Sequence, residues 1–402
     1  MNKKTVRDIE LTDKKVIVRV DFNVPLKDGQ ITDDARIVKA LPTLQYILDK
    51  RPKCLILMSH LGRPKGKVDP QYSLKPIAEY LPKVLLQTIS LLDDCVGDEV
   101  KQQIDRKQVG EIVLLENLRF HAQEEKNDPE FAKKLAELAD VYVNDAFGTA
   151  HRAHASTEGI TKYLPSVAGL LLEKELIYFE KALEKPEHPF VAILGGAKVS
   201  DKIKLIENLM ERVDAILIGG AMSKTFLKAQ GIAVGNSKVE DAGITIAKDI
   251  LKKAESKKVK IYLPLDHVVA DDFSETANVK TTASTAIQEG WQGLDIGPKT
   301  VKSFCDVLAT AKMVVWNGPL GVFEMQPFAG GTRAIADVIA GSEMVSIIGG
   351  GDTAAAIKDF CLESKMSHIS TGGGASLEYL EGKVLPGVAA LANKQTAGSK
   401  SL

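Results

Sequence analysis

A glycine-rich turn at residues 344–357, with the sequence MVSIIGGGDTAAAI, combines residue types that suit phosphate and metal chemistry. The apolar run at 345–348 predicts a strand, the three glycines predict a tight turn, and the alanines predict a helix start. Backbone N–H groups and the helix dipole at such a turn favour a phosphate. Asp352 could hold magnesium, which prefers carboxylate and phosphate oxygens. The alternative is a structural turn in which Asp352 or Thr353 caps the helix.

Apolar runs that end in glycine recur through the second half of the chain. They lie at 190–194, 215–218, 312–316 and 345–348, and are followed by GGAKVSDKI, GGAMSKTF, NGPLGVFE and GGGDT. The third of these turns supplies Asn317 and Glu324, and a later turn, HISTGGGAS, supplies Gly373 and Gly374. Glycine turns also arise from plain α/β geometry, but their repetition predicts a nucleotide lying across one sheet edge.

Two further features of the second half suit a nucleotide. Lys198 and Lys202 lie four apart beside a glycine turn, on one face if the segment is helical, and would suit a polyphosphate. Solvated helix lysines are the alternative. The looser segment at 291–300, WQGLDIGPKT, could form an apolar, backbone-lined slot for a base from Gly293, Leu294 and Gly297.

The first half carries cations instead, since eight of the ten arginines precede residue 153. Predicted strands at 14–20, 54–58, 111–115 and 141–143 each end in polar residues, which include Asp21, Asn23, His60, Arg63, Arg119, His151, Arg152 and His154. Arg36 lies in TDDARI, where Thr32 or Asp33 could cap a helix. Ligands collect beyond the carboxyl ends of parallel strands, so the pattern predicts a basic cleft for a small, highly anionic ligand. Metal binding by His151 and His154 is the alternative, although no Cys or acidic cluster completes a set.

The elements that position these residues form an α/β protein of more than one domain. A chain of 402 residues is too long for one ordinary core. The sequence at 167–185, VAGLLLEKELIYFEKALEK, has Leu172, Leu176, Phe179 and Leu183 at helical spacing, and two prolines follow it. We predict a connecting helix at 167–185 between a lobe at 1–166 and a second lobe at 186–379.

Composition limits the classes of partner and compartment. The formal charge of −1 gives no global signal for nucleic acid or acidic membranes, and no run approaches a membrane-spanning length. Four widely separated cysteines, with no CxxC pair, predict free thiols in a reducing compartment. The basic start, MNKKTVRDIE, is followed by no apolar stretch, so we expect no signal peptide and a cytoplasmic location.

Two common nucleotide signatures are missing from the sequence. It contains neither GxxxxGK[ST] nor a GxGxxG after the first strand with an acid about 20 residues on. This counts against a P-loop enzyme and against an NAD-dependent oxidoreductase.

Taken together, DFNVP, SHLGRP, ENLRF, VNDAFGTAHRAHAS, LGGAKVSDKI, WNGPLGVFE, GGGDT and STGGGAS closely resemble the phosphoglycerate kinase family. The resemblance runs from about residue 5 to LPGVAAL at 385–391. One departure is Gln123, where many relatives have glycine, and it bears on the turn geometry of that loop. The resemblance implies two Rossmann-like, doubly wound parallel-sheet lobes joined by a helix and hinge, with the tail at about 380–402 returning to the first lobe.

The resemblance also implies site residues and ligands. The first lobe would bind 3-phosphoglycerate or 1,3-bisphosphoglycerate through Asp21, Asn23, Arg36, His60, Arg63, Arg119 and Arg152. The second would bind ATP or ADP with Mg²⁺ through Lys202, Gly293, Asn317, Glu324, Gly350, Gly351, Asp352 and Thr353, with Asp352 on the metal. Lys198 would follow the transferred phosphoryl group, and Gly373 and Gly374 would face it.

The reaction implied is reversible, direct in-line phosphoryl transfer with domain closure, in glycolysis. The acceptor is a carboxylate that needs no general base, so we assign Arg36, Lys198, backbone N–H groups and magnesium to charge stabilisation, and His60 is not expected to be a nucleophile. A non-catalytic nucleotide-binding protein on the same fold is the main alternative, but it should have lost Arg36, Lys198 or Asp352. The family suggests a monomer, and no basic tract argues for nucleic-acid binding.

Overall fold

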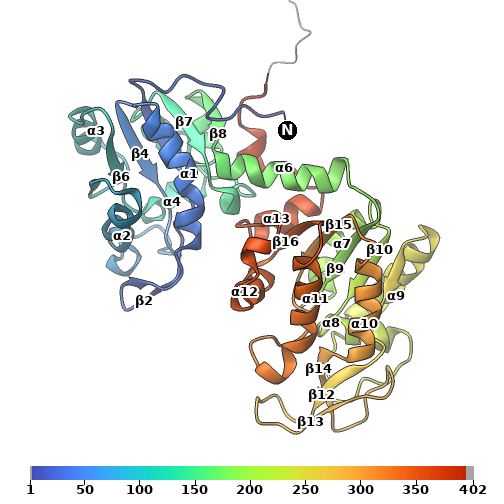
Figure 1. Ribbon diagram of the computed structural model, residues 1–402. Helices are drawn as coiled ribbons and strands as arrows, with labels where there is room; N and C mark the ends of the chain where they lie inside the picture. Colours follow the sequence, from blue (N-terminus) through green and yellow to red (C-terminus); the bar gives the residue numbers. More distant parts are fainter. Residues whose placement is uncertain (1, 395–402) are drawn as a thin grey trace, which may run out of the picture. The chain divides into compact units, whose positions relative to one another are not determined.

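The computed structural model describes residues 2–394, which form two compact units (Figure 1). The first unit comprises the described residues up to Ile177 together with those from Val384, and the second comprises Tyr178–Lys383. The division falls inside helix α6 (Leu170–Glu184). Each unit is built on one six-stranded parallel sheet, which confirms the predicted fold class.

The sheet of the first unit has the order β5-β6-β4-β1-β7-β8, and every neighbouring pair is parallel. Its strands are β1 (Lys15–Arg19), β4 (Cys54–Met58), β5 (Ile89–Leu91), β6 (Glu111–Leu114), β7 (Val141–Asn144) and β8 (Ser166–Ala168). The chain adds strands on one side of β1 and then crosses to β7 on the other side. The switch point of this doubly wound sheet, where ligands usually bind, therefore lies at the carboxyl ends of β1 and β7.

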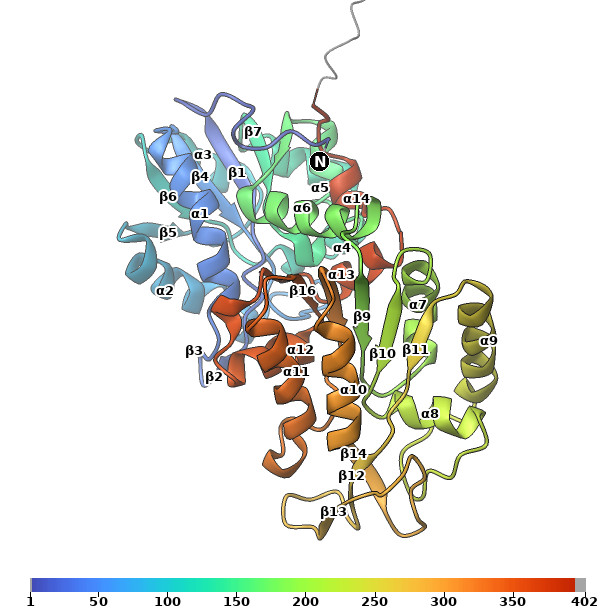
Figure 2. The ribbon, with the colours of Figure 1, turned by 45° about the vertical axis from the view of Figure 1, so that its right-hand side comes forward.

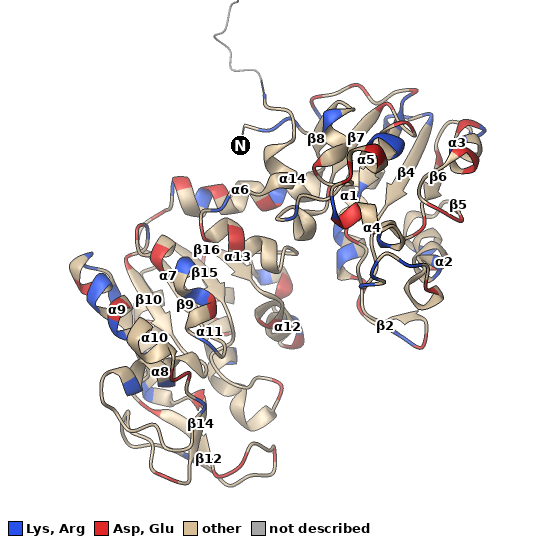
Figure 3. Cartoon of the chain, turned by 180° about the vertical axis from the view of Figure 1, so that it is seen from behind, with Lys and Arg blue, Asp and Glu red and all other residues tan. Residues whose placement is uncertain are grey.

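Helices and a small hairpin surround this sheet. In Figure 1, α1 covers the near face of the sheet, and Figure 3 shows α5 over the opposite face. The helices are α1 (Ala35–Asp49), α2 (Lys75–Leu85), α3 (Asp98–Asp105), α4 (Ala122–Glu125), α5 (Pro129–Ala136) and α14 (Pro386–Ala389), and the hairpin pairs β2 (Leu26–Lys27) with β3 (Gln30–Ile31). Figure 3 also shows basic and acidic residues interspersed along the helices.

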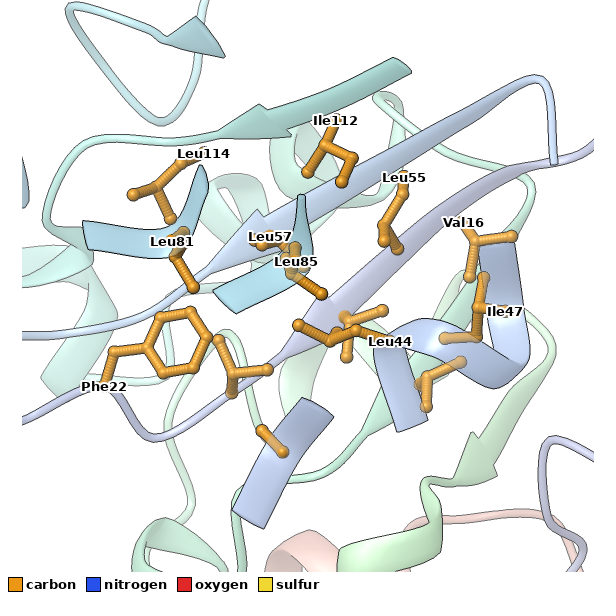
Figure 4. Packing of buried hydrophobic residues seen from close by; sticks show 14 of the residues in the cluster. Val16, Phe22, Leu44, Ile47, Leu55, Leu57, Leu81, Leu85, Ile112 and Leu114 are labelled. Carbon is orange, nitrogen blue, oxygen red and sulfur yellow. The ribbon is translucent and has the colours of Figure 1, made fainter. Parts of the chain in front are cut away.

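The core explains why these segments fold as they do. Val16 and Leu55, on neighbouring strands, lie in one buried cluster with Leu44 of α1 and Leu81 of α2 (Figure 4). The residues that alternate with Val16 and Leu55 along each strand point to the other face of the sheet. They are buried too, since all five residues of β4 are buried. Burial on both faces is the reason for the continuous apolar runs of a parallel sheet.

The C-terminal segment belongs to the first unit. Lys4 donates its backbone N–H to Ala392 (2.8 Å), Ala392 donates to Ser166 (3.0 Å), and Gly387 donates to Ala150 (2.9 Å). The tail was expected from about residue 380, but residues 380–383 lie in the second unit. Positions 395–402 lie outside the described residues.

The second unit repeats the doubly wound pattern with the order β11-β10-β9-β15-β16-β17 (Figure 2). Its strands are β9 (Phe190–Leu194), β10 (Ala215–Ile218), β11 (Lys260–Tyr262), β15 (Met313–Asn317), β16 (Val345–Gly349) and β17 (His368–Ile369). Its helices are α7 (Ile203–Leu209), α8 (Met222–Ala229), α9 (Gly243–Ser256), α10 (Pro298–Leu308), α11 (Gly330–Ala340), α12 (Gly351–Asp359) and α13 (Gly374–Leu380). The switch point lies between β9 and β15.

Three local expectations differ from the structure. Residues 166–168 form β8 and the helix begins at Leu170, because Val167 completes the sheet beside β7. The segment at 291–300 is not loose: it contains β14 (Gln292–Ile296) in an antiparallel sheet with β12 (His267–Ala270) and β13 (Val279–Thr281). Gln123 lies inside α4, and its backbone is not left-handed, so glycine is not required there.

None of the helices formed by residues 2–394 combines the length and the apolar character that crossing a membrane requires. The four cysteines are free thiols, as predicted, with Cys54 and Cys95 buried.

Candidate active site

An ion pair between Arg36 and Asp21 lies at the switch point of the first sheet. Asp21 follows β1, and its Oδ2 accepts a hydrogen bond from Nη1 of Arg36 at 2.8 Å. The Asp21 side chain is only 10% exposed, whereas Arg36 keeps 36% of its side chain accessible. The N-cap residue of α1 is Asp34, not Thr32 or Asp33, although Oδ1 of Asp33 accepts from Ala35 N at 2.9 Å. The carboxylate therefore orients a guanidinium that remains open to an anion.

Asn23 and Arg119 hold opposite sides of the loop that follows β4. The Oδ1 atom of Asn23 accepts from Gly62 N at 2.9 Å, and Nη1 of Arg119 donates to Gly62 O at 2.9 Å. Nε of Arg119 also lies 3.3 Å from Glu125. The predicted residues from three strand ends thus meet around one loop. In contrast, Arg63 in the same loop is exposed, and its side chain forms no hydrogen bond or ion pair within residues 2–394.

His60 is buried next to Arg19, a residue that the sequence did not single out as functional. Nη2 of Arg19 lies 3.1 Å from Nδ1 of His60, and Arg19 Nε donates to Ser156 Oγ at 2.8 Å. Because guanidinium is only a donor, Nδ1 of His60 must accept, and its proton is on Nε2. Burial and the neighbouring Arg19, Arg119 and Arg36 hold the pKa of His60 well below its usual value. His60 is therefore a neutral hydrogen-bond donor, not a nucleophile or a cation.

The loop after β7 adds Arg152 and two histidines. Arg152 donates from Nε to Nε2 of His151 at 3.2 Å. His154 is buried, and burial together with Arg19, Arg119 and Arg152 lowers its pKa to about 3. Glu124 is fully buried and accepts from Ser156 N at 2.9 Å, so it partly balances these charges. This crowding of cations fits an anionic ligand.

In the second unit, Lys202 and Asn317 meet at the switch point. Nζ of Lys202 donates to the backbone oxygen of Asn317 at 3.0 Å and also to its side-chain oxygen. Burial lowers the pKa of Lys202 to about 8, and the charge of Asp352 opposes this shift. Beside them a Cβ on Gly195 would lie 1.9 Å from Pro319 O, so only glycine lets β9 and the Pro319 loop approach this closely.

The start of α12 has the strand–turn–helix form that its sequence predicted. Gly350 is the N-cap with φ +88°, a conformation that favours glycine. No side chain caps this helix, so the alternative role for Asp352 or Thr353 is wrong. Thr353 instead accepts from Gly318 N at 2.7 Å, which joins the turns after β15 and β16. Asp352 is exposed in the first helical turn.

Comparisons with known proteins identify this arrangement. The family model described as phosphoglycerate kinase matches residues 6–383. The chain belongs to the phosphoglycerate kinase family. It is 56% identical over 397 residues to "Phosphoglycerate kinase" of Pseudothermotoga lettingae and 55% identical over 394 residues to that of Moorella thermoacetica, covering 98% of this chain and 100% of each relative. The solved phosphoglycerate kinase from Coxiella burnetii superposes with a TM-score of 0.89 at 43% identity, covering 96% of this chain and 98% of that one.

Kinases of this family use ATP or ADP, generally with a divalent metal. Mg²⁺ typically binds one or two carboxylates and completes its shell with water and substrate phosphates. Exposed Asp352, beside the N–H groups of the α12 terminus, fits such a partial ligand set. His151 and His154 do not fit the alternative, because the one group of metal-ligating side chains found among residues 2–394 excludes both.

Several predicted residues of the second unit do not contact the group formed by Lys202, Asn317 and Thr353. Lys198 is exposed ahead of the short 3₁₀ turn Ser200–Lys202, so it does not share a helical face with Lys202. Glu324 is exposed, and Gly373 is the N-cap of α13 with φ +49°. Gly293 lies on the small antiparallel sheet, where its N–H donates to Ser237 Oγ at 2.9 Å.

Sequence reasoning also missed a buried pair formed by α8 and a strand of this small sheet. Lys224 and Asp295 are both almost fully buried, and burial shifts the pKa of Lys224 down to about 8 and that of Asp295 up to about 7. Asp295 accepts from Gly331 N at 2.6 Å, and Lys224 donates to Gly220 O at 3.2 Å. Lys224 occupies an apolar position of α8, and that pattern break was the available signal.

Proposed function

We propose that the protein is a glycolytic phosphoglycerate kinase, which transfers a phosphoryl group reversibly between 1,3-bisphosphoglycerate and ADP to give 3-phosphoglycerate and ATP. The observation that carries this proposal is the division of binding groups between two switch points. Cationic and histidine side chains gather at the first, and glycine-rich backbone with a buried lysine gathers at the second.

The first unit binds the phosphoglycerate in this proposal. Arg36, Arg63, Arg119 and Arg152 supply charge-assisted contacts, and His60 donates from Nε2. Oδ2 of Asp21 already accepts from Arg36, and Oδ1 of Asn23 already accepts from Gly62 N. Their main contribution is therefore to position donors, with the remaining carboxylate and amide atoms available to the substrate hydroxyl.

The second unit binds the nucleotide in this proposal. Gly350, Gly351 and Thr353 present the α12 terminus to the phosphates, Lys202 and Asn317 flank it, and Gly293 and Glu324 contact the nucleoside. Asp352 holds Mg²⁺, which would neutralise phosphate charge when bound.

Charge stabilisation, not acid–base chemistry, drives the reaction. The acceptor carboxylate is already deprotonated, so the absence of a general base is consistent with direct transfer. Arg36, Lys198 and the backbone at Gly373 and Gly374 stabilise charge on the moving phosphoryl group. Direct transfer requires both substrates to meet, so we propose that the units close on each other during turnover. We further propose that the protein acts as a monomer in the cytoplasm.

A coupled assay tests the proposal. ATP and 3-phosphoglycerate are supplied with and without Mg²⁺, and a coupling enzyme that reduces the acyl phosphate consumes NADH. We expect rapid turnover that depends on Mg²⁺. A folded protein that binds ADP but shows no turnover would support the non-catalytic alternative instead.

A further inference from the structure

Three side chains of different ligand types meet in the first unit, and none of them is among the residues assigned to substrate. Asp94 and Cys95 lie in the loop between β5 and α3 (Figure 2), and His121 lies where the 3₁₀ turn Leu118–Phe120 meets α4. One ligand atom from each lies within 4.8 Å of the other two. Among residues 2–394, these are the only Cys, His and acidic side chains found grouped in this way.

Hydrogen bonds already hold the three residues against one another. Nε2 of His121 lies 2.6 Å from Oδ1 of Asp94, and the same oxygen accepts a hydrogen bond from the backbone N–H of Cys95 at 2.6 Å. Cys95 is fully buried, while the side chains of Asp94 and His121 are 48% and 29% exposed. The sulfur thus forms the floor of a site whose two other members face solvent, and protons occupy the space between the donor atoms.

The donor set matches a particular class of ion. A thiol, an imidazole and a carboxylate suit Zn²⁺ or Co²⁺, whereas Mg²⁺ and Ca²⁺ prefer oxygen ligands alone. Typical bond lengths to zinc place neighbouring ligand atoms of a tetrahedral site about 3.4–3.6 Å apart. The separation of 2.6 Å between Nε2 of His121 and Oδ1 of Asp94 is shorter than that value, and the sulfur lies within 4.8 Å of both atoms. A shift of about 1 Å by the exposed Asp94 side chain would open the site.

We propose that Asp94, Cys95 and His121 bind a divalent transition-metal ion of the Zn²⁺ class, with water in the fourth position. On binding, the thiol releases its proton to solvent and the sulfur lone pair is donated to the metal. The Nε2 lone pair of His121 becomes a ligand once its proton is on Nδ1. The ion would tie the loop after β5 to the segment that carries Arg119, two residues before His121.

Cobalt provides a direct readout of this site. Untagged full-length protein is titrated with Co²⁺ in the absence of nucleotide and Mg²⁺, and absorption is followed in the visible and near-ultraviolet. We expect a thiolate-to-cobalt charge-transfer band that saturates at a single equivalent. Zn²⁺ should then remove the band, because zinc binds such ligands more tightly than cobalt does.

Matched variants identify the ligands. Cys95→Ala should abolish the charge-transfer band, whereas Cys361→Ala, which changes an exposed cysteine, should leave it intact. Loss of an outer-shell partner alone typically costs a metal site about 10–100-fold in affinity, so His121→Gln should weaken Co²⁺ binding at least tenfold. His121 is partly exposed, so this variant tests the site even where the buried Cys95→Ala variant does not fold.

Results in the wild type or in the variants could overturn the proposal. One is the absence of a thiolate band in the wild-type protein at saturating Co²⁺, which would leave the Asp94–His121 contact an ordinary hydrogen bond. The other is a band that persists in His121→Gln at unchanged affinity or disappears in Cys361→Ala, because the metal would then bind elsewhere.

Discussion

Arg19 on β1 donates from Nη2 to Nδ1 of His60, 3.1 Å away, in a setting where His60 is only 4% exposed. The bond joins neighbouring strand ends and fixes the histidine in its neutral form. A cation next to an imidazole works against a second positive charge, which is why the pKa of His60 is depressed so far.

This relationship predicts how stability depends on pH. A depressed histidine pKa favours the folded state above the unfolded pKa of about 6.5, and this contribution is lost as pH falls further, because the unfolded chain binds the proton first. We expect urea-unfolding midpoints of the wild type to fall between pH 6.5 and 5. In His60→Asn, which keeps an acceptor for Arg19, the fall should be smaller by up to about 1.4 kcal/mol per pH unit. An unchanged slope in His60→Asn would show that another group carries the dependence.

Removing the Arg36 guanidinium should affect turnover far more than nucleotide binding. In our proposal Arg36 stabilises charge that develops on the phosphoryl group, and such arginines are typically worth about a thousandfold or more in kcat. We expect Arg36→Ala to lose activity on that scale in the coupled assay, with the KM for ATP changed little. Arg106→Ala, an exposed arginine at the end of α3, is the control. Equal kcat values for the two variants would remove Arg36 from the transition state.

Much of the fold follows from the sequence because parallel sheets are buried on both faces. The apolar runs at 54–58, 190–194 and 215–218 became strands with those same limits. The limits of elements were harder to predict where one stretch of sequence supplies two neighbouring elements. Val167 directly precedes the apolar start of α6 but pairs in β8, and the segment at 291–300 contains Gly293, Gly297 and Pro298 although it forms β14. Such choices depend on neighbouring strands that are distant in sequence.

The candidate site was predictable to a similar extent. Residues that directly follow a strand, such as Asp21 and Asn317, were found because the chain delivers them to the carboxyl edge. Arg19 was missed because it lies inside the apolar run at 14–20, where a single charged residue is read as part of the strand and not as a functional residue. Its importance depends on His60 and Ser156, which come from other elements. No local pattern encodes that contact.

Glycine at position 350 should be required for stability, whereas glycine at 351 should not. Gly350 has φ +88°, and an added Cβ would lie 2.9 Å from Nδ2 of Asn317. Gly350→Ala should therefore lower the free energy of unfolding by about 1–3 kcal/mol, the usual cost of a strained backbone. Gly351 is helical with open space around its Cα, so Gly351→Ala should be neutral or slightly stabilising. Chemical denaturation of both variants measures the difference, and equal losses would contradict the assigned strain.

Lys202 should make nucleotide binding depend on pH. Its pKa of about 8 means that the free protein loses this charge above pH 8, although a bound phosphate would favour the charged form. We expect the KM for ATP to rise between pH 8 and 9 in the wild type. Lys202→Met should bind ATP more weakly, and its KM should not depend on pH. Lys202→Arg should remain charged, so its KM for ATP should stay constant between pH 8 and 9. A wild-type KM that is constant across this range would rule out a direct contact with the phosphates.

Asp145, which bonds the start of α6, should make the stability of the folded state depend on pH with the opposite sign to His60. Its Oδ1 atom accepts from Leu171 N (3.0 Å) and Leu172 N (3.2 Å), and Thr43 hydrogen-bonds to it as well. Its Oδ2 atom is buried without a partner, and burial raises the pKa of this carboxyl to about 7. A raised acid pKa stabilises the folded state at low pH, and this contribution is lost as pH rises from about 4 through 7.

Asp145→Asn keeps the acceptor for the helix start without a charge to bury. We therefore expect the variant to lose less stability than the wild type between pH 5 and 7.5 in urea titrations, and parallel curves would show that Asp145 is not the titrating group.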